Sequence, residues 1–256
     1  MGCGRKIGPY DCCSIICGDC LELMRAIPDG CIDAVITDPP YGIGRDGSKA
    51  STGSHGGRKG YVFAGLDSER PGAAVFCEIL RIAEKVIIWG GNYFADMLPA
   101  TQKWLVWDKG QRIDQSDGEL AWTSFSGALR ILTLNRCALR LDVTEHPTQK
   151  PVKLLRWCIE QAKCSGVILD PFIGSGTTLV AARRMGLHFL GFEINEAYCQ
   201  IARERIALVE AQANLFERTK QLRQECLNYQ GEDKEGALRG ELDALVELEM
   251  LKEGEK

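Results

Sequence analysis

The sequence predicts an α/β fold built on a mostly parallel, doubly wound sheet with an antiparallel edge strand. Short apolar runs at 14–17, 32–37, 166–170 and 188–193 have the length of strands. The run at 32–37 is apolar on both faces, which suits a central strand covered by helices on both sides. From residue 150 onward, helical segments of about ten residues alternate with the strands, a pattern typical of a parallel sheet.

The remaining elements follow in chain order, and glycine and proline mark their ends. The Pro39–Pro40 pair must end the strand at 32–37, and Pro151 suits the first turn of a helix, where a missing N–H is tolerated. Shorter, partly antiparallel β structure is expected over 119–141. Helices are predicted at 21–27, 73–83, 150–163, 177–186 and 195–211, and further strands at 85–91 and 104–108.

The length of 256 residues, 45% of them hydrophobic, suits one sizeable core. We expect a single domain over 1–206 with an insertion at about 45–145, followed by a charged helical extension over 207–256. Leu238, Leu242 and Leu245 lie at helical spacing in that extension. A solvated helix is one interpretation, and a helix that pairs two copies into a homodimer is the other.

The net charge of −4 is unevenly distributed. Residues 207–256 hold 12 acidic and 7 basic side chains, whereas 45–156 hold 16 basic and 12 acidic ones. A modest basic bias in the middle segment is compatible with a face that contacts phosphates. No apolar run is long enough for a membrane span or a secretory signal, so we expect no membrane partner and a cytoplasmic location.

Twelve cysteines are many for such a chain, and most lie in predicted strands and helices, where free thiols act as small hydrophobes. Five are clustered near the N-terminus: Cys3, Cys12, Cys13, Cys17 and Cys20. Cys17 and Cys20 have the CxxC spacing, but there is no second CxxC and no histidine pair at finger spacing. We therefore expect no structural metal.

A glycine turn between a strand and a helix is the first motif with chemical meaning. Gly174 and Gly176 let the backbone approach a ligand, and the helix that starts at Thr177 favours an anion. Glu193 ends the next strand, near the spacing at which an acid binds ribose hydroxyls. Because Leu179 replaces the third glycine of the dinucleotide pattern, a cofactor with a single ribose is favoured over NAD.

The tetrapeptide Asp38, Pro39, Pro40 and Tyr41 follows the strand at 32–37. A carboxylate and a rigid backbone carbonyl can accept both N–H groups of an exocyclic base amine, whose lone pair then points to a methyl donor. An aromatic ring beside them can stack on the base. The alternative interpretation is that the prolines simply end a strand.

Three segments, DAVITDPPYG, HPTQKP and ILDPFIGSGTTLVAARRMGLHFLGFEIN, together resemble the signature motifs of amino-group DNA methyltransferases. The order resembles the class in which the catalytic tetrapeptide precedes the cofactor loop, with target recognition between them. The resemblance covers roughly residues 14–206. It implies a Rossmann-like fold, S-adenosylmethionine as the cofactor and double-stranded DNA as the partner, with methylation at specific sites as in restriction–modification systems.

The resemblance also implies roles for particular residues. Asp38, Pro39, Pro40 and Tyr41 would form the catalytic motif. The residues implied around the cofactor are Asp19, Thr148, Gln149, Lys150, Asp170, Pro171, Phe172, Gly174, Gly176, Thr177 and Glu193.

An aspartate at the first position of the tetrapeptide resembles the adenine-N6 subgroup, because the cytosine-N4 enzymes more often carry serine there. The expected function is methylation of the N6 amine of adenine in DNA after base flipping. N4-cytosine methylation and a catalytically inactive DNA-binding relative are the alternatives. Methylation of RNA or of a protein glutamine is a further alternative, although the glutamine enzymes usually begin the tetrapeptide with asparagine and place it after the cofactor loop.

Overall fold

The protein was examined as a computed structural model, which describes residues 3–44, 67, 69–110, 116–135, 149–228 and 242. It divides into two compact units, Met1–Arg205 and Ile206–Lys256. Several sequence expectations lie outside the described residues: parts of the 45–145 insertion, Thr148, and most of the leucine pattern after residue 230.

The first unit carries all the strands that the structure describes. The strands are β1 (Lys6–Ile7), β2 (Tyr10–Asp11), β3 (Ser14–Cys17), β4 (Ile32–Thr37), β5 (Ala83–Trp89), β6 (Trp104–Asp108), β7 (Gly118–Thr123), β8 (Arg130–Thr133), β9 (Val167–Asp170) and β10 (His188–Glu193). The helices are α1 (Cys20–Arg25), α2 (Ala73–Ile82), the short 3₁₀ helix η1 (Gly91–Tyr93), α3 (Val152–Ala162), α4 (Thr177–Arg184) and α5 (Glu196–Asn228).

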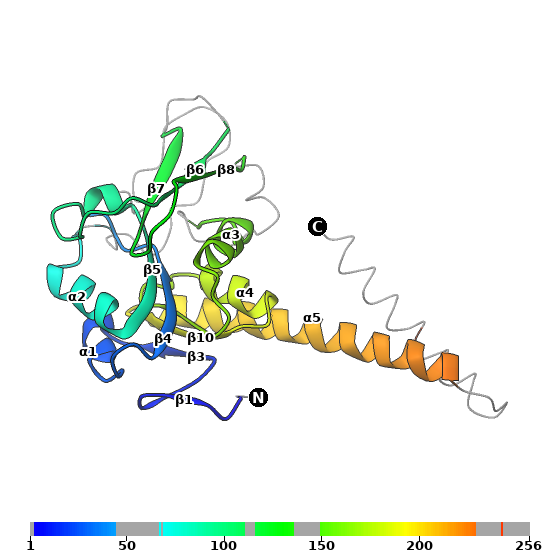
Figure 1. Cartoon of the computed structure of the whole chain (residues 1–256). Helices are drawn as coiled ribbons and strands as arrows, with labels where there is room; N and C mark the ends of the chain where they lie inside the picture. Colours follow the sequence, from blue (N-terminus) through cyan, green and yellow to red (C-terminus); the bar gives the residue numbers. More distant parts are fainter. Residues whose placement is uncertain are drawn as a thin grey trace, which may run out of the picture. The chain divides into compact units, whose positions relative to one another are not determined.

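Eight strands form the central sheet in the order β3-β10-β9-β4-β5-β7-β6-β8 (Figure 1). The first five are parallel to one another. Within this sheet β7 runs antiparallel to both its neighbours, β5 and β6, while β8 is parallel to β6 and forms the edge. The predicted mostly parallel α/β sheet is thus confirmed, but the antiparallel strand expected at the edge is β7, which lies inside the sheet between β5 and β6. The small β1–β2 hairpin was not predicted, because strands of two residues leave no periodic pattern.

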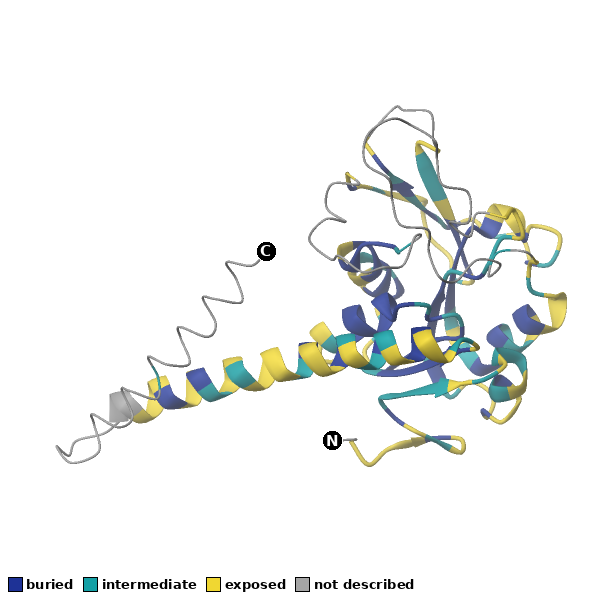
Figure 2. Cartoon of the chain, turned by 180° about the vertical axis from the view of Figure 1, so that it is seen from behind, coloured by how far each residue is buried: buried dark blue, intermediate teal, exposed yellow. Residues whose placement is uncertain are grey.

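Helices cover both faces of the sheet because its central strands are apolar on both faces. α1 and α2 lie on one face and α3 and α4 on the other (Figure 1). The buried side chains of β4 alternate accordingly: Val35 belongs to the core under α1 and α2, and its buried neighbours Ala34 and Ile36 point to the opposite face. Figure 2 shows most of the central sheet as buried, and α4 is buried from Thr177 to Ala182.

The chain changes its winding direction between β4 and β9, which are parallel neighbours. From β4 the chain continues to β5 on one side, and from β9 it continues to β10 on the other. Open α/β sheets bind ligands outside the carboxyl ends of the strands at such a switch point. Asp38, which follows β4, and Pro171, which follows β9, lie at that position.

The helix predicted over 195–211 is longer in the structure, because α5 runs from Glu196 to Asn228 and thus into the second unit. No glycine or proline interrupts residues 196–228, so nothing local ends the helix earlier. Within the second unit, the Thr219 hydroxyl donates to the carbonyl of Leu215. None of the helices that the structure describes is long and apolar enough to cross a membrane.

Candidate active site

The acidic tetrapeptide lies directly after β4, at the carboxyl end of the strand. The Tyr41 hydroxyl donates a 2.6 Å hydrogen bond to Oδ1 of Asp38. The backbone N–H groups of Tyr41 and Gly42 both donate to Oδ1 of Asp67, at 2.6 and 2.9 Å. The two prolines therefore end the strand, and Asp67 fixes the turn that follows.

The Tyr41 ring is held on two sides. It stacks on Tyr93, with ring centroids 4.7 Å apart and planes 15° from parallel, and Phe94 meets it edge-on. Beneath it lies Gly90, which follows β5 and has φ +67°; a Cβ there would come within 2.1 Å of Cε1 of Tyr41. The position thus requires glycine for both its conformation and its close contact.

Asp38 is the first of four side chains that lie in a row with alternating charge. The others are Lys150, Glu119 and Lys109. Lys150 contacts Oδ2 of Asp38 and also lies 3.2 Å from Oε2 of Glu119, whose other oxygen pairs with Lys109 at 2.6 Å. The side chains of Lys150 and Lys109 are buried, and those of Asp38 and Glu119 are partly buried, at 31% and 27% exposed. Each carboxylate therefore has a cation within contact distance, as partly buried charges require.

This arrangement shifts the acid–base properties of its members. Burial lowers the pKa of Lys150, but Asp38, Tyr41 and Glu119 outweigh it and raise that pKa well above the ordinary value. Burial also raises the pKa of Glu119, yet Lys150 and Lys109 bring it down to about 2. Burial raises the pKa of Asp38, and the contact with Lys150 opposes this rise. Lys150 and Glu119 therefore form a charged pair at neutral pH.

The two motifs meet across β4 and β9. The hydroxyl of Thr37 donates a 2.7 Å hydrogen bond to Oδ1 of Asp170, which also accepts the Phe172 N–H at 3.0 Å. Asp170 is buried, and burial raises its pKa to about 6 in spite of these hydrogen bonds. The acidic tetrapeptide and the glycine turn, far apart in the sequence, thus start from neighbouring strand ends.

The glycine turn joins β9 to α4 with both glycines in the left-handed region, Gly174 at φ +49° and Gly176 at φ +81°. A Cβ on Gly176 would lie 2.8 Å from Cβ of Ala202 in α5, so the helix packs directly on the turn. Gly176 is the N-cap of α4, and Thr177 is its first helical residue. Arg205 fixes the turn from α5, since its guanidinium donates to the Ser175 carbonyl at 2.6 Å and to the Thr177 hydroxyl at 3.1 Å.

Glu193, the last residue of β10, is the predicted ribose ligand. One of its oxygens accepts the Gly174 N–H at 2.9 Å and the other accepts the Asn195 N–H at 3.0 Å. The side chain is buried, which raises its pKa above the ordinary value. A carboxylate has about four acceptor positions, so each oxygen retains capacity for a hydroxyl donor.

The structure places the other predicted residues as follows. Asp19 is the N-cap of α1 and accepts the Glu22 N–H at 3.0 Å, so it already has a structural role. It follows Gly18, whose N–H donates to the Glu193 carbonyl, and this places Asp19 at the same edge of the sheet. Gln149 accepts a 3.5 Å hydrogen bond from Ser175. Pro171 is buried and Phe172 packs against the core.

Glu119, Lys109 and Asp67 were not found from the sequence. Glu119 lies on β7 and Lys109 just after β6, in a region where the sequence shows only short, irregular β structure. No motif marks them, because their relation to Asp38 depends on the order of strands in the sheet. The one available signal was an acidic residue in the otherwise mostly apolar stretch from Glu119 to Thr123.

The comparisons with known proteins agree with this geometry. A family model described as DNA methylase matches residues 88–204. The chain is 30% identical to the putative methylase YubD of Escherichia coli K12 over 222 residues, which covers 75% of this chain and 89% of YubD. It is 24% identical to the type II methyltransferase M.HinfI of Haemophilus influenzae, covering 80% of this chain and 71% of that protein.

Solved structures share the fold. The complex of M1.HpyAVI with SAM has a TM-score of 0.50 at 22% identity, covering 75% of this chain and 98% of that one. The cytosine-N4-specific PvuII DNA methyltransferase has a TM-score of 0.51 at 15% identity, covering 75% of this chain and 85% of that one.

The doubly wound sheet, with carboxylates at the carboxyl ends of its two switch-point strands, defines an α/β protein of the DNA methyltransferase fold. By its sequence relatives, the chain belongs to the DNA methylase family and is an amino-group (N6 or N4) DNA methyltransferase.

Proposed function

We propose that this chain transfers a methyl group from S-adenosylmethionine to the N6 amine of adenine at specific sites in DNA. The observation that carries the proposal is the hydrogen bond from Thr37 to Asp170, which joins the ends of β4 and β9. The residue after Thr37 is the tetrapeptide's aspartate, and the residues after Asp170 form the glycine turn. A base held by one and a cofactor held by the other would be neighbours.

The residues of the glycine turn suit S-adenosylmethionine, which supplies an electrophilic methyl group when bound. Glu193 would accept the two ribose hydroxyls, since each of its oxygens is positioned by one backbone N–H and retains acceptor capacity. The N-terminus of α4, after Gly176, would favour the carboxylate of the methionine part. Phe172, Pro171 and Asp170 would line the cofactor beside β9, with Asp19, Thr148 and Gln149 around it.

Asp38 and the Pro39 carbonyl would accept the two N–H groups of the target amine. This directs the amine lone pair, otherwise delocalised into the ring, out of the base plane. Tyr41 would stack on the base, and its own packing on Tyr93 leaves the ring little freedom to lose on binding. Aromatic stacking on a base contributes about 1 to 3 kcal/mol.

Lys150 would hold Asp38 in position and can move away from it towards Glu119 when the substrate binds. Both Asp38 oxygens have donors in this structure, Tyr41 on one and Lys150 on the other. Each oxygen has one donor and so retains acceptor capacity for an incoming amine. Lys150 has a second acceptor at Glu119, 3.2 Å away, so it can release Asp38 without losing its only counter-ion. Glu119 is therefore proposed as a positioning residue.

The target base is paired inside the duplex, so it must leave the stack first, at a cost of a few kcal/mol. The insertion at about 45–145 is proposed to recognise the DNA sequence. The choice of adenine over cytosine rests on the aspartate at position 38.

Sequencing of methylated DNA would test the proposal. DNA from cells that express this chain is read by a long-read method that detects modified bases, beside cells that express Asp38→Ala. We expect N6-methyladenine in one short sequence motif and none in the variant culture. N4-methylcytosine in place of N6-methyladenine would overturn the choice of base. If the purified protein binds S-adenosylmethionine but DNA from the expressing cells is unmodified, the proposed reaction is overturned.

A further inference from the structure

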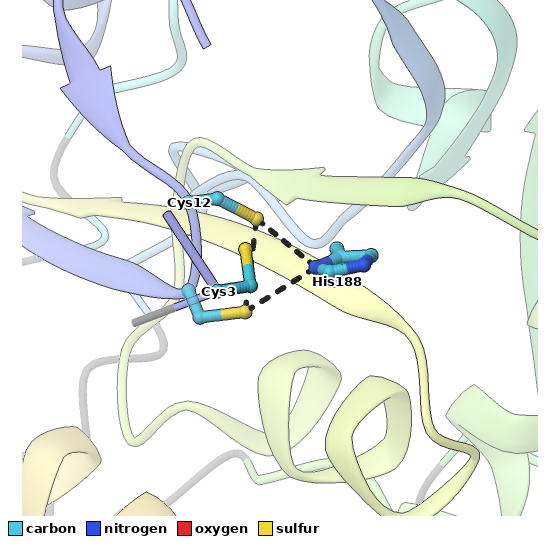
Figure 3. A group of neighbouring side chains, drawn as sticks. Cys3, Cys12 and His188 are labelled. Atoms are coloured by element: carbon cyan, nitrogen blue, oxygen red, sulfur yellow. Dashed lines mark hydrogen bonds between the residues drawn. The ribbon is translucent and has the colours of Figure 1, made fainter. Parts of the chain in front are cut away.

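Three cysteines and one histidine gather at the N-terminal end of β10. The Cys12 sulfur lies 3.7 Å from the Cys13 sulfur, and Nδ1 of His188 lies 3.2 Å from the first and 3.8 Å from the second. Cys3 completes the group, whose four ligand atoms all lie within 4.8 Å of one another. Figure 3 shows the side chains of Cys3 and Cys12 beside the ring of His188.

These separations match those around a tetrahedral zinc ion. Zn–S bonds of about 2.3 Å and Zn–N bonds of about 2.05 Å place two sulfurs about 3.8 Å apart and a sulfur and a nitrogen about 3.6 Å apart. The S···S and S···N separations given above lie within about 0.4 Å of these values. A disulfide requires sulfurs about 2.05 Å apart, and the structure has all three cysteines as free thiols.

Backbone hydrogen bonds bring Cys12, Cys13 and His188 together independently of any ion. The Cys12 N–H donates to the Arg5 carbonyl at 2.9 Å, which closes the β1–β2 hairpin. The Cys13 N–H donates to the Phe189 carbonyl at 2.8 Å, which holds Cys13 next to His188. Cys13 adopts φ +61°, a left-handed conformation that residues with a side chain rarely adopt.

We propose that Cys3, Cys12, Cys13 and His188 bind a structural zinc ion. Three thiolates and one imidazole form a closed tetrahedral set, which leaves no position for a substrate. The site lies at the first residue of β10, whereas Glu193 is the last residue of the same strand. Its role is to fasten the N-terminal hairpin to β10, at the opposite end of that strand from the proposed cofactor ligand.

Metal analysis of the full chain, purified without chelator, would test the site. We expect about one zinc ion per chain in the parent protein and a large loss of zinc in Cys3→Ser and in His188→Ala. Cys3 is exposed, so its replacement leaves the core intact. Cys17 and Cys199 belong to a second group with Glu196 and provide the control, because Cys17→Ser with Cys199→Ser should keep the zinc.

Two further measurements distinguish the loss of a zinc ligand from a general disturbance of the fold by the substitution. His188→Cys supplies a fourth thiolate and should retain zinc that His188→Ala loses. Cobalt(II) bound to the zinc-free protein should give thiolate-to-cobalt charge-transfer absorption that weakens in Cys3→Ser. Protein without zinc that takes up neither metal would overturn the proposal. So would zinc content that depends on Cys17 and Cys199, or loss of the thiols to a disulfide.

Discussion

The hydroxyl of Thr37 donates a 2.7 Å hydrogen bond to the carboxylate of Asp170, although the two residues are 133 positions apart. Both side chains are buried, and each ends a strand of the parallel pair β4 and β9. The hydrogen bond therefore fixes the distance between the tetrapeptide that would hold the base and the turn that would hold the cofactor.

The first prediction concerns the pH dependence that Asp170 confers. Burial raises its pKa in the folded protein to about 6 from the ordinary value of 3.8, so the folded state binds the proton more tightly. The stabilisation is fully present below pH 3.8 and is lost as the pH rises through about 6. Asp170→Asn retains an oxygen that can accept from Thr37 and Phe172, and it does not titrate.

We therefore expect the stability of the parent, relative to Asp170→Asn, to fall by about 2 kcal/mol between pH 4 and pH 7. Urea unfolding of both proteins across that range measures the difference, in which contributions from other titrating groups cancel. Parallel pH profiles would show that Asp170 titrates near its ordinary value.

The second prediction concerns Lys150. Lys150→Met removes the cation that Asp38 and Glu119 share, so the free energy of unfolding should fall by about 3 to 5 kcal/mol and methyl transfer should be lost. Glu119 keeps its ion pair with Lys109 in that variant but then repels Asp38 without an intervening cation, so adding Glu119→Gln should restore part of the stability and none of the activity. Urea unfolding and transfer of labelled methyl groups to DNA measure the two effects.

The exposed Glu160 provides the control, since Glu160→Gln should change neither quantity. A double variant no more stable than Lys150→Met would argue that Glu119 and Lys150 are not coupled.

The third prediction separates the hydroxyl and the ring of Tyr41. Tyr41→Phe loses one hydrogen bond to Asp38, worth about 1 kcal/mol, but keeps the stack on Tyr93. Tyr41→Ala also loses the surface proposed to stack on the base, so kcat/KM for DNA should fall by a further factor of about 5 to 150. Equal losses in both variants would argue against the stacking role. S-adenosylmethionine binding, measured in parallel, should change little in either.

The fourth prediction concerns the close approach of α5 to the glycine turn. Alanine at position 176 meets Ala202 and also has to adopt φ +81°, whereas alanine at position 186 adopts φ +72° in open space. Gly176→Ala should therefore lower the free energy of unfolding by about 1 to 3 kcal/mol more than Gly186→Ala. It should also weaken S-adenosylmethionine binding, which Gly186→Ala should not. Thermal unfolding and calorimetric titration would measure the two effects.

The sequence by itself determined the strands that carry the motifs and the residues that end them. Apolar runs, prolines and glycines act over a few neighbouring positions, so the ends of β4 and β9 were readable at Asp38 and Asp170. The mostly parallel, doubly wound sheet followed from the alternation of strands and helices. The length of α5 and the β1–β2 hairpin did not, because they depend on weaker or shorter local signals.

Only the tertiary structure decided which side chains, distant in the sequence, form ion pairs or lie close enough to bind one metal ion. Glu119 reaches Lys150 because β7 enters the sheet beside β5, and His188 reaches Cys13 from 175 positions away because β10 pairs with β3. No structural metal was expected, because the sequence has no second CxxC and no histidine pair at finger spacing, and His188 lies 175 positions from Cys13. Strand order is set by the burial of whole faces of the sheet, so it cannot be predicted from a local sequence pattern.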